Sequence, residues 1–235
     1  MRVERRFMKG AEVRATEAPA TKAPQIEGYA AVFNQWFTMY EDDDFVIRET
    51  IAPGAFTEVL GSSDVRCLFN HRADHVLGRT TNDTLQLAQD DAGLKYTNLM
   101  DPDTHIGRDV YQFVKRGDVT GCSFAFTVGD DEAHQTWAER EDEQGRTIIE
   151  RTIVKVSGLY DVGPVTYPAY EQTSVSVHEL APAAEKAVAL RCADWSDDLP
   201  EEIRQRILAG KEKKPKFDVE LARRRTRNIQ IDASL

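Results

Sequence analysis

The chain has 235 residues, of which 41% are hydrophobic and 9% aromatic, and its formal net charge is −10. This length fits one large domain or one domain with tails, and the apolar fraction can fill a core, which excludes a globally disordered chain. No apolar run approaches the roughly 20 residues that span a bilayer, and three scattered cysteines exclude a disulfide framework.

The charge is unevenly distributed along the chain. Residues 1–22 carry six basic and three acidic side chains, and residues 201–235 carry ten basic and six acidic ones, so the part between them is strongly acidic. An acidic body with basic ends argues against a core that binds nucleic acid. The charged N-terminus lacks the apolar segment of a secretory signal. We therefore expect a soluble protein of a reducing compartment, with no membrane and no specific nucleic acid among its partners.

The first half of the chain predicts short strands after a flexible leader. Residues 1–25 end in an Ala-, Thr- and Pro-rich stretch, which is typical of a mobile segment. The strands expected after it, from alternating or β-branched runs bounded by turn residues, cover 28–33, 45–51, 65–71, 84–87 and 94–99. The acidic loop at 41–44 lacks the Asp/Asn/Gly spacing of a calcium loop, so no metal is predicted there.

The second half holds the clearest helix and the last strands. Ile106, Val110, Phe113 and Val114 recur at helical spacing, which predicts a helix over 104–116. Further strands are expected at 120–128, 147–156, 159–167 and 174–177, with a polar hairpin or surface loop at 129–147 and helices at 180–193 and 199–208. The sequence predicts a mainly β (α+β) fold with flanking helices, divided into a leader (1–25), a domain (26–180) and a helical, basic tail (181–235).

Ser123 is the leading candidate nucleophile. On a strand over 120–128, Cys122, Phe124 and Phe126 share one face and Ser123 lies on the other, beside the small Ala125. We expect open space above this serine. Cys122 would instead point into the core, where a cysteine is inert. The GCSFAF run lacks the second glycine of a nucleophile elbow, which argues against an α/β-hydrolase esterase.

A serine hydroxyl needs a base to accept its proton, and His71 is the best-placed histidine. It follows an apolar strand, and the end of a strand is a fixed position that suits a general base. His71 and His75 have the i, i+4 spacing of a metal pair, but HRADH shows no helical periodicity and no third ligand is evident, so zinc is not predicted.

Six segments, in order, resemble the prohead (capsid maturation) serine proteases of tailed phages, which are related to the herpesvirus assemblins. They cover about residues 27–178 and read EGYAAVFN, IAPGAF, FNHR with VLGRT, GLKYTNL, RGDVTGCSFAF and LYDVGPVTYPAY. The resemblance implies a closed antiparallel β-barrel of the assemblin type, with the catalytic histidine of the NH motif at His71 and the serine of the G-x-S-F motif at Ser123. It implies no cofactor and no metal.

The third catalytic residue is open between two carboxylates. Glu150 follows Ser123 by one hairpin, as expected for a neighbouring strand, and Asp161 lies in the LYDVG motif. We favour Glu150. No arginine follows LYDVGPV to supply an assemblin-like oxyanion donor, so backbone N–H groups are expected to serve.

The resemblance implies an endopeptidase that cleaves the major capsid protein and scaffold, and itself as well, inside the procapsid in the bacterial host cytoplasm, with possible self-association. Two alternatives remain: a catalytically inactive capsid-assembly protein on the same fold, and a serine esterase. Ser123→Ala separates them, because only the protease loses peptide cleavage.

Overall fold

The computed structural model describes residues 3–6, 13–18, 23–166, 201 and 203–207. The chain divides into two compact units, residues 1–193 and 194–235, and the first unit holds every strand described below. Residues 201 and 203–207 are helical, within the predicted helix at 199–208. The strand predicted at 174–177, the helix at 180–193 and the expected boundary near 180 lie outside the described residues.

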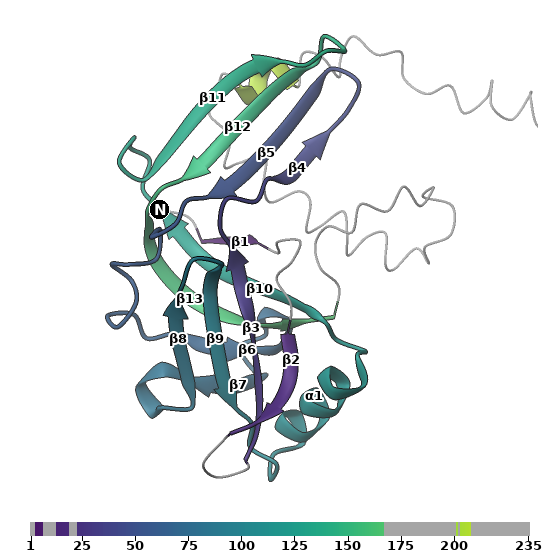
Figure 1. Ribbon diagram of the computed structural model, residues 1–235, viewed down its shortest axis with the longest axis vertical. Helices are drawn as coiled ribbons and strands as arrows, with labels where there is room; N and C mark the ends of the chain where they lie inside the picture. The colour runs from purple at the N-terminus through teal and green to yellow at the C-terminus, as the bar shows by residue number, and fades with distance from the viewer. Residues whose placement is uncertain (1–2, 7–12, 19–22, 167–200, 202, 208–235) are drawn as a thin grey trace, which may run out of the picture. The chain divides into compact units, whose positions relative to one another are not determined.

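The first unit is mainly β, as predicted, and its strands form three sheets (Figure 1). One sheet has the order β1 (Glu4–Arg6), β10 (Gly121–Val128), β13 (Val156–Val165), β6 (Arg66–Leu68) and β7 (Val76–Arg79). The second has the order β11 (Gln135–Glu141), β12 (Thr147–Ile153), β5 (Phe45–Ile51) and β4 (Phe37–Glu41). The third has the order β2 (Val13–Glu17), β3 (Pro24–Val32), β9 (Gly93–Leu99) and β8 (Leu85–Gln89).

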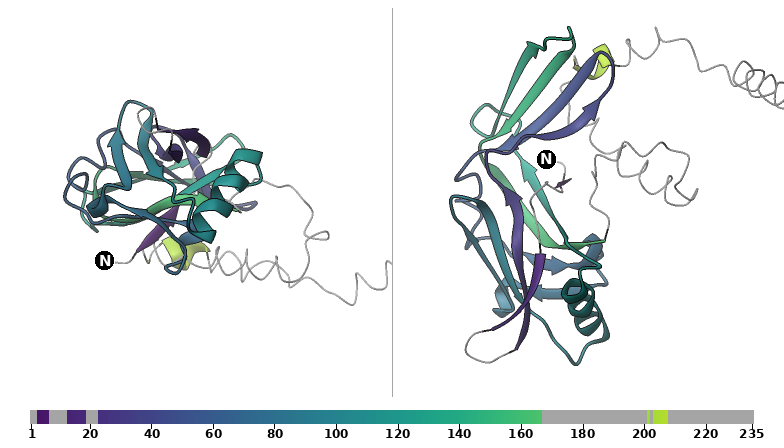
Figure 2. Two further views of the ribbon diagram at one scale, coloured as in Figure 1. Left: turned by 90° about the horizontal axis from the view of Figure 1, so that it is seen from below. Right: turned by 45° about the vertical axis from the view of Figure 1, so that its right-hand side comes forward.

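The described residues of this unit form one α-helix and two short 3-10 turns. Helix α1 (His105–Arg116) lies beside β2 in both Figure 1 and Figure 2, and two short 3-10 turns, η1 (Phe69–His71) and η2 (Thr80–Asn82), flank β7. The Thr104 hydroxyl caps α1 by accepting from the N–H of Gly107 at 3.1 Å, and Gly117 ends it in a left-handed conformation. Among the described residues, no helix is long and apolar enough to cross a membrane.

Two of the strand pairs are parallel, where the sequence analysis expected antiparallel pairing throughout. Strand β12 runs parallel to β5, and β13 runs parallel to β6. Parallel neighbours need a long connection between them, and the chain between each of these pairs passes through other strands and α1. Residues that are distant in sequence therefore meet in the first two sheets.

Two described segments of the predicted flexible leader form strands instead. Strands β1 and β2 both lie within it, and β2 pairs antiparallel with β3, with Val13 opposite Gly28. Pairing with β3 satisfies the backbone groups of β2 and buries Val13, which overrides the polar composition of the segment. The break between the last two strands also differs, since β12 ends at Ile153 and β13 begins at Val156.

An aromatic cluster supports β10 from behind. The Phe124 ring stacks on Phe126 with centroids 4.7 Å apart and meets the edge of Phe56 at 5.8 Å, and Phe56 stacks on Phe33 at 6.1 Å. Phe56, Phe124 and Phe126 are fully buried. The turn that carries Phe56 is therefore part of the support for the strand that carries Ser123.

Phe56→Ala should destabilise the protein by about 3–5 kcal/mol, because it removes a fully buried ring and leaves a cavity against β10. Guanidinium unfolding followed by circular dichroism measures this change. Leu99→Ala, at a side chain that is 37% exposed, is the control and should cost less than about 1 kcal/mol. Equal losses in the two variants would contradict the packing role of Phe56.

Candidate active site

Strand β10 carries Ser123 between β1 and β13. In the antiparallel register of β10 and β13, Ser123 lies opposite Gly163 and Ala125 lies opposite Asp161. Because alternate residues of a strand share a face, Ser123 and Asp161 lie on the same side of the sheet as diagonal neighbours. The open space expected above Ser123 is absent, since its side chain is among the buried ones at 5% exposure. The site is therefore enclosed by neighbouring chain.

His71 reaches this face from the end of β6. Strand β6 runs parallel to β13, with Arg66 opposite Asp161, and His71 ends the 3-10 turn that follows β6. Asn70 and His71 both adopt left-handed backbone conformations, with φ of 57° and 55°. Such residues cost of order 1–3 kcal/mol each and persist only where their surroundings hold them.

Asn70 supplies part of that support. Its side-chain nitrogen donates to Thr166 Oγ1 at 3.0 Å, and its side-chain oxygen accepts from the N–H of Thr166 at 2.8 Å. These two bonds tie the turn to the end of β13. Asparagine also tolerates the left-handed conformation better than most residues, since its short polar side chain makes local hydrogen bonds. The residue before His71 is thus held against the end of β13.

A close approach of two backbones completes the placement of β13. A Cβ added to Gly163 would lie 2.2 Å from the carbonyl oxygen of Leu68 in β6. Any larger residue would push β13 away from β6, so this glycine keeps the strand of Asp161 next to the strand that leads to His71.

The three side chains are joined through the imidazole. His71 Nδ1 lies 2.6 Å from Asp161 Oδ1, and His71 Nε2 lies 2.6 Å from Ser123 Oγ. A carboxylate only accepts, so Nδ1 carries the ring proton and donates it to Asp161, which leaves Nε2 free to accept from the serine hydroxyl. A hydroxyl, an imidazole and a carboxylate in this order can activate the hydroxyl as a nucleophile for acyl transfer.

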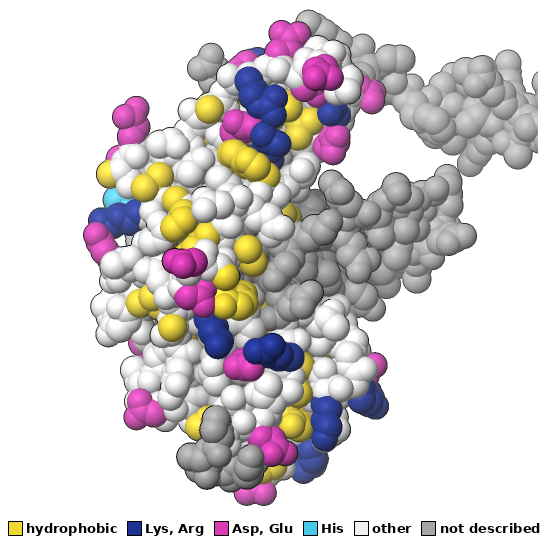
Figure 3. All heavy atoms as spheres, viewed as in Figure 1, with side chains coloured by type: hydrophobic (Ala, Val, Ile, Leu, Met, Phe, Trp, Pro, Cys, Tyr) yellow, Lys and Arg dark blue, Asp and Glu magenta, His cyan; other side chains and the backbone are white. Residues whose placement is uncertain are grey.

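Glu150 does not lie at His71, which corrects the position expected for it. Strand β12 pairs with β11 and β5, in a different sheet from β10. The Glu150 carboxylate accepts from Arg48 Nε at 2.9 Å and from Arg140 Nε at 3.0 Å. Desolvation raises the pKa of Glu150, but the hydrogen bonds from the two arginines outweigh it and lower the pKa overall. Figure 3 shows basic and acidic side chains side by side over this sheet, in the upper part of the view.

Cys122 and His75 take the positions expected of structural residues. Cys122 is fully buried behind β10, with Sγ 3.2 Å from the Tyr96 hydroxyl. The His75 ring stacks on Phe69, and the backbone of His75 closes the turn by accepting from the N–H of Phe69 at 3.1 Å. In the part of the chain that the structure describes, no group of three or more histidine, cysteine or acidic residues is arranged to hold a metal.

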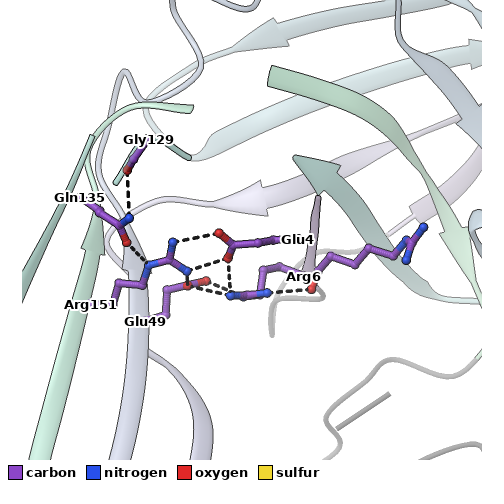
Figure 4. A network of polar contacts seen from close by, with 7 residues as sticks. Glu4, Arg6, Glu49, Gly129, Gln135 and Arg151 are labelled. Atoms are coloured by element: carbon purple, nitrogen blue, oxygen red, sulfur yellow. Dashed lines mark hydrogen bonds and ion pairs between the residues drawn. The ribbon is translucent and has the colours of Figure 1, made fainter. Parts of the chain in front are cut away.

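A buried ion-pair cluster, which the sequence analysis missed, forms around β1 on the face of β10 that carries Phe124 and Phe126, opposite the face of Ser123. Figure 4 shows Glu4 and Arg6 of β1 together with Glu49 of β5 and Arg151 of β12. Arg151 donates to Glu4 at 2.6 and 2.9 Å and to Glu49 at 2.8 Å, and Arg6 donates to Glu49 at 2.8 and 3.1 Å and to Glu4 at 2.6 Å. All four side chains are buried, and their charges cancel.

Electrostatic pairing keeps Arg151 ionised in this cluster. Burial lowers the pKa of Arg151, but the negative charges of Glu49 and Glu4 more than compensate and raise the pKa overall. Gln135 adds a further bond, since its side-chain oxygen accepts from Arg151 Nε at 2.7 Å. Removing one member would leave a buried charge without its partner, which typically costs about 3–5 kcal/mol.

The backbone of the same strand touches Ser123 itself. Ser123 Oγ lies 2.9 Å from the carbonyl oxygen of Arg6 and can donate to it. The serine has one hydroxyl proton and two acceptors within reach, His71 Nε2 and this carbonyl. Through this carbonyl, β1 contacts the candidate nucleophile directly.

Comparison with known families agrees with this geometry. The family model described as caudovirus prohead serine protease matches residues 9–186. The chain belongs to this family. It is therefore a serine protease, and the resemblance noted in the sequence is confirmed. Neither a search of curated proteins nor a search of solved structures found a match.

The matched region of this prohead protease includes all three residues joined through the imidazole, and it begins after β1. The sequence analysis singled out His71 and Ser123, and it ranked Asp161 second to Glu150 as the third catalytic residue. The signal that favours Asp161 is register, because it lies on the strand paired with β10 and faces the same side as Ser123. Strand order is not readable from a single sequence, so this signal was out of reach.

Glu150→Gln should lower stability by roughly 1 kcal/mol at pH 7, because the amide cannot pair ionically with Arg48 and Arg140. The folded state lowers the pKa of Glu150, so its contribution is present above the ordinary glutamate pKa of about 4.3 and is lost as pH falls further. Melting curves of both proteins should therefore differ at pH 7 and converge near pH 3. Glu143→Gln, at an exposed turn position, is the control; a gap that persists at low pH would contradict the ionic role.

Proposed function

We propose that Ser123 is the nucleophile of this protease, His71 its general base and Asp161 the residue that orients the imidazole. The observation that carries the proposal is the double contact of His71, with Ser123 Oγ and Asp161 Oδ1 each 2.6 Å from one ring nitrogen. Asp161 takes the role that the sequence analysis gave to Glu150. The support is geometric, since the Glu150 carboxylate is bonded to two arginines in another sheet.

The roles follow from the chemistry of each group. Ser123 Oγ attacks the carbonyl carbon of the scissile bond while His71 Nε2 takes the hydroxyl proton and then gives it to the leaving amine. Asp161 holds the tautomer with the proton on Nδ1 and stabilises the imidazolium that forms. Water then releases the acyl group from Ser123 by the same route. Buried surroundings strengthen the Asp161–imidazolium attraction relative to water.

We propose the major capsid protein and the scaffold as substrates, cleaved during maturation inside the procapsid in the host cytoplasm. Family membership supports a role in capsid maturation. Self-cleavage, self-association and the closed antiparallel barrel of the assemblin type stay predictions. The two parallel strand pairs are a feature that any such barrel has to accommodate.

Ser123→Ala should abolish cleavage of the major capsid protein, because no hydroxyl remains to attack the scissile carbonyl. Mass spectrometry of the capsid protein, co-expressed with wild-type or variant chain, measures this loss. Circular dichroism should show the same fold, since losing one buried hydroxyl bond costs about 1 kcal/mol. Ser62→Ala, at an exposed position, is the control and should process normally. Normal processing by folded Ser123→Ala would favour the inactive assembly protein and overturn the assignment.

Asp161→Asn should lower turnover by about 10²–10⁴-fold, because the amide can hold the imidazole in the wrong tautomer. KM should change little, because the lost carboxylate stabilises mainly the transition state. Glu150→Gln should keep turnover within a few-fold of wild type. Parallel kinetics on a capsid-derived peptide decide between them. If Glu150→Gln loses turnover while Asp161→Asn remains active, Glu150 is restored to the role.

A further inference from the structure

Strand β1 occupies the edge of β10 beside Ser123. It is the outermost strand of its sheet, and it pairs antiparallel with β10 so that Arg6 lies opposite Phe124 and Glu4 opposite Phe126. It has only three residues and lies outside the region that the family model matches. Without β1, the edge of β10 would offer a row of backbone donors and acceptors next to the nucleophile.

An extended peptide recognised by β-strand addition makes two kinds of contact. Backbone hydrogen bonds to a sheet edge supply affinity, and pockets for alternate side chains supply specificity. A protease further requires a backbone carbonyl at its nucleophile. Strand β1 meets all three conditions: it pairs with β10, it buries alternate side chains, and its Arg6 carbonyl oxygen lies 2.9 Å from Ser123 Oγ.

The alternate side chains of β1 enter a charged pocket, formed by Glu49 and Arg151, on the face of β10 that carries Phe124 and Phe126. Glu4 and Arg6 point inward and are buried, whereas Arg5 is exposed on the other face. Arg151 binds the Glu4 carboxylate with two bonds, and Glu49 binds the Arg6 guanidinium with two bonds (Figure 4). The pocket therefore distinguishes an acidic side chain from a basic one, two positions apart along an extended chain.

We propose that the β10 edge is the substrate-binding edge of the protease, that Glu49 and Arg151 are its specificity residues, and that β1 fills the site as an intramolecular pseudosubstrate. The substrate class is an extended peptide with an acidic residue two positions before a basic residue whose carbonyl faces Ser123. This inference rests on the proposed function of Ser123.

The pocket also suits reversible occupation. Glu49 and Arg151 are bonded to each other at 2.8 Å, so they remain a neutral pair when both charges of β1 leave together. A buried pair of this kind avoids the cost of an uncompensated charge. While β1 is in place, its carbonyl competes with His71 for the single hydroxyl proton of Ser123, and the strand edge is taken. Displacement of β1 leaves the Ser123 hydroxyl proton to His71 and opens the edge of β10 to a substrate.

The test compares full-length wild type with Glu4→Ala/Arg6→Ala, which removes both charges and leaves the pocket neutral. Arg5→Ala on the exposed face of the same strand is the matched control. Two quenched fluorescent peptides serve as substrates: Val-Glu-Arg-Arg-Phe-Met, and Val-Arg-Arg-Glu-Phe-Met with the acidic and basic positions exchanged. The double variant should cleave the first peptide with kcat/KM about tenfold above wild type, because the competent state is no longer occupied, and Arg5→Ala should match wild type.

The peptide pair tests the pocket without any variant. Wild type should prefer the Glu-x-Arg peptide to the exchanged one by about tenfold or more, since the exchanged peptide places like charges on Glu49 and Arg151. Equal rates for the two peptides, or a folded double variant no faster than wild type, would show that β1 is only a structural strand and overturn the inference. The proposed function fails separately, when Ser123→Ala and wild type process the capsid protein alike.

Discussion

The register between β10 and β13 is the constraint on which the site depends. It places Ser123 opposite Gly163 and Asp161 opposite Ala125, so the two side chains proposed to act with His71 face one side of the sheet. A slip of one residue would turn Asp161 to the other face and separate it from the imidazole. Gly163 protects this register, because its hydrogen lets β13 lie against the backbone of Leu68 in β6. The turn at the end of β6 then places His71 within hydrogen-bond distance of both Ser123 and Asp161.

Local signals in the sequence were enough for the individual elements. The strand over 45–51 and the helix after Thr104 form where turn residues and apolar spacing predict them, because their signals are contained in a few neighbouring residues. Ser123 and His71 could be singled out for the same reason, each at a recognisable strand position. Asp161 could not be preferred, because its role depends on which strand lies next to β10. The hairpin after β10 leads into another sheet, and β13 returns to pair with it.

The strand β1 could not be predicted from the N-terminal sequence for a related reason. Glu4 and Arg6 are residues that usually lie in solvent, so their composition predicts a mobile leader. Their partners are Glu49 and Arg151, which are 43 and 147 positions away along the chain. A buried charge is tolerable only when its partner is in place, and a single sequence does not reveal such distant pairs. The strand is ordered by contacts that only the folded sheet supplies.

Two departures from local rules occur close to Ser123, and they have a physical meaning. Two consecutive non-glycine residues, Asn70 and His71, are left-handed, and four buried charges form one cluster around β1, the strand whose backbone contacts Ser123. Neither feature adds stability by itself, since left-handed residues are strained and a buried ion pair is often no better than apolar packing. What both provide is fixed geometry. The turn aims one imidazole at two partners, and the cluster holds one strand by the sign of its charges. Features that cost stability are kept where position and discrimination matter, and in the proposed mechanism those needs meet at Ser123 and at the peptide that binds beside it.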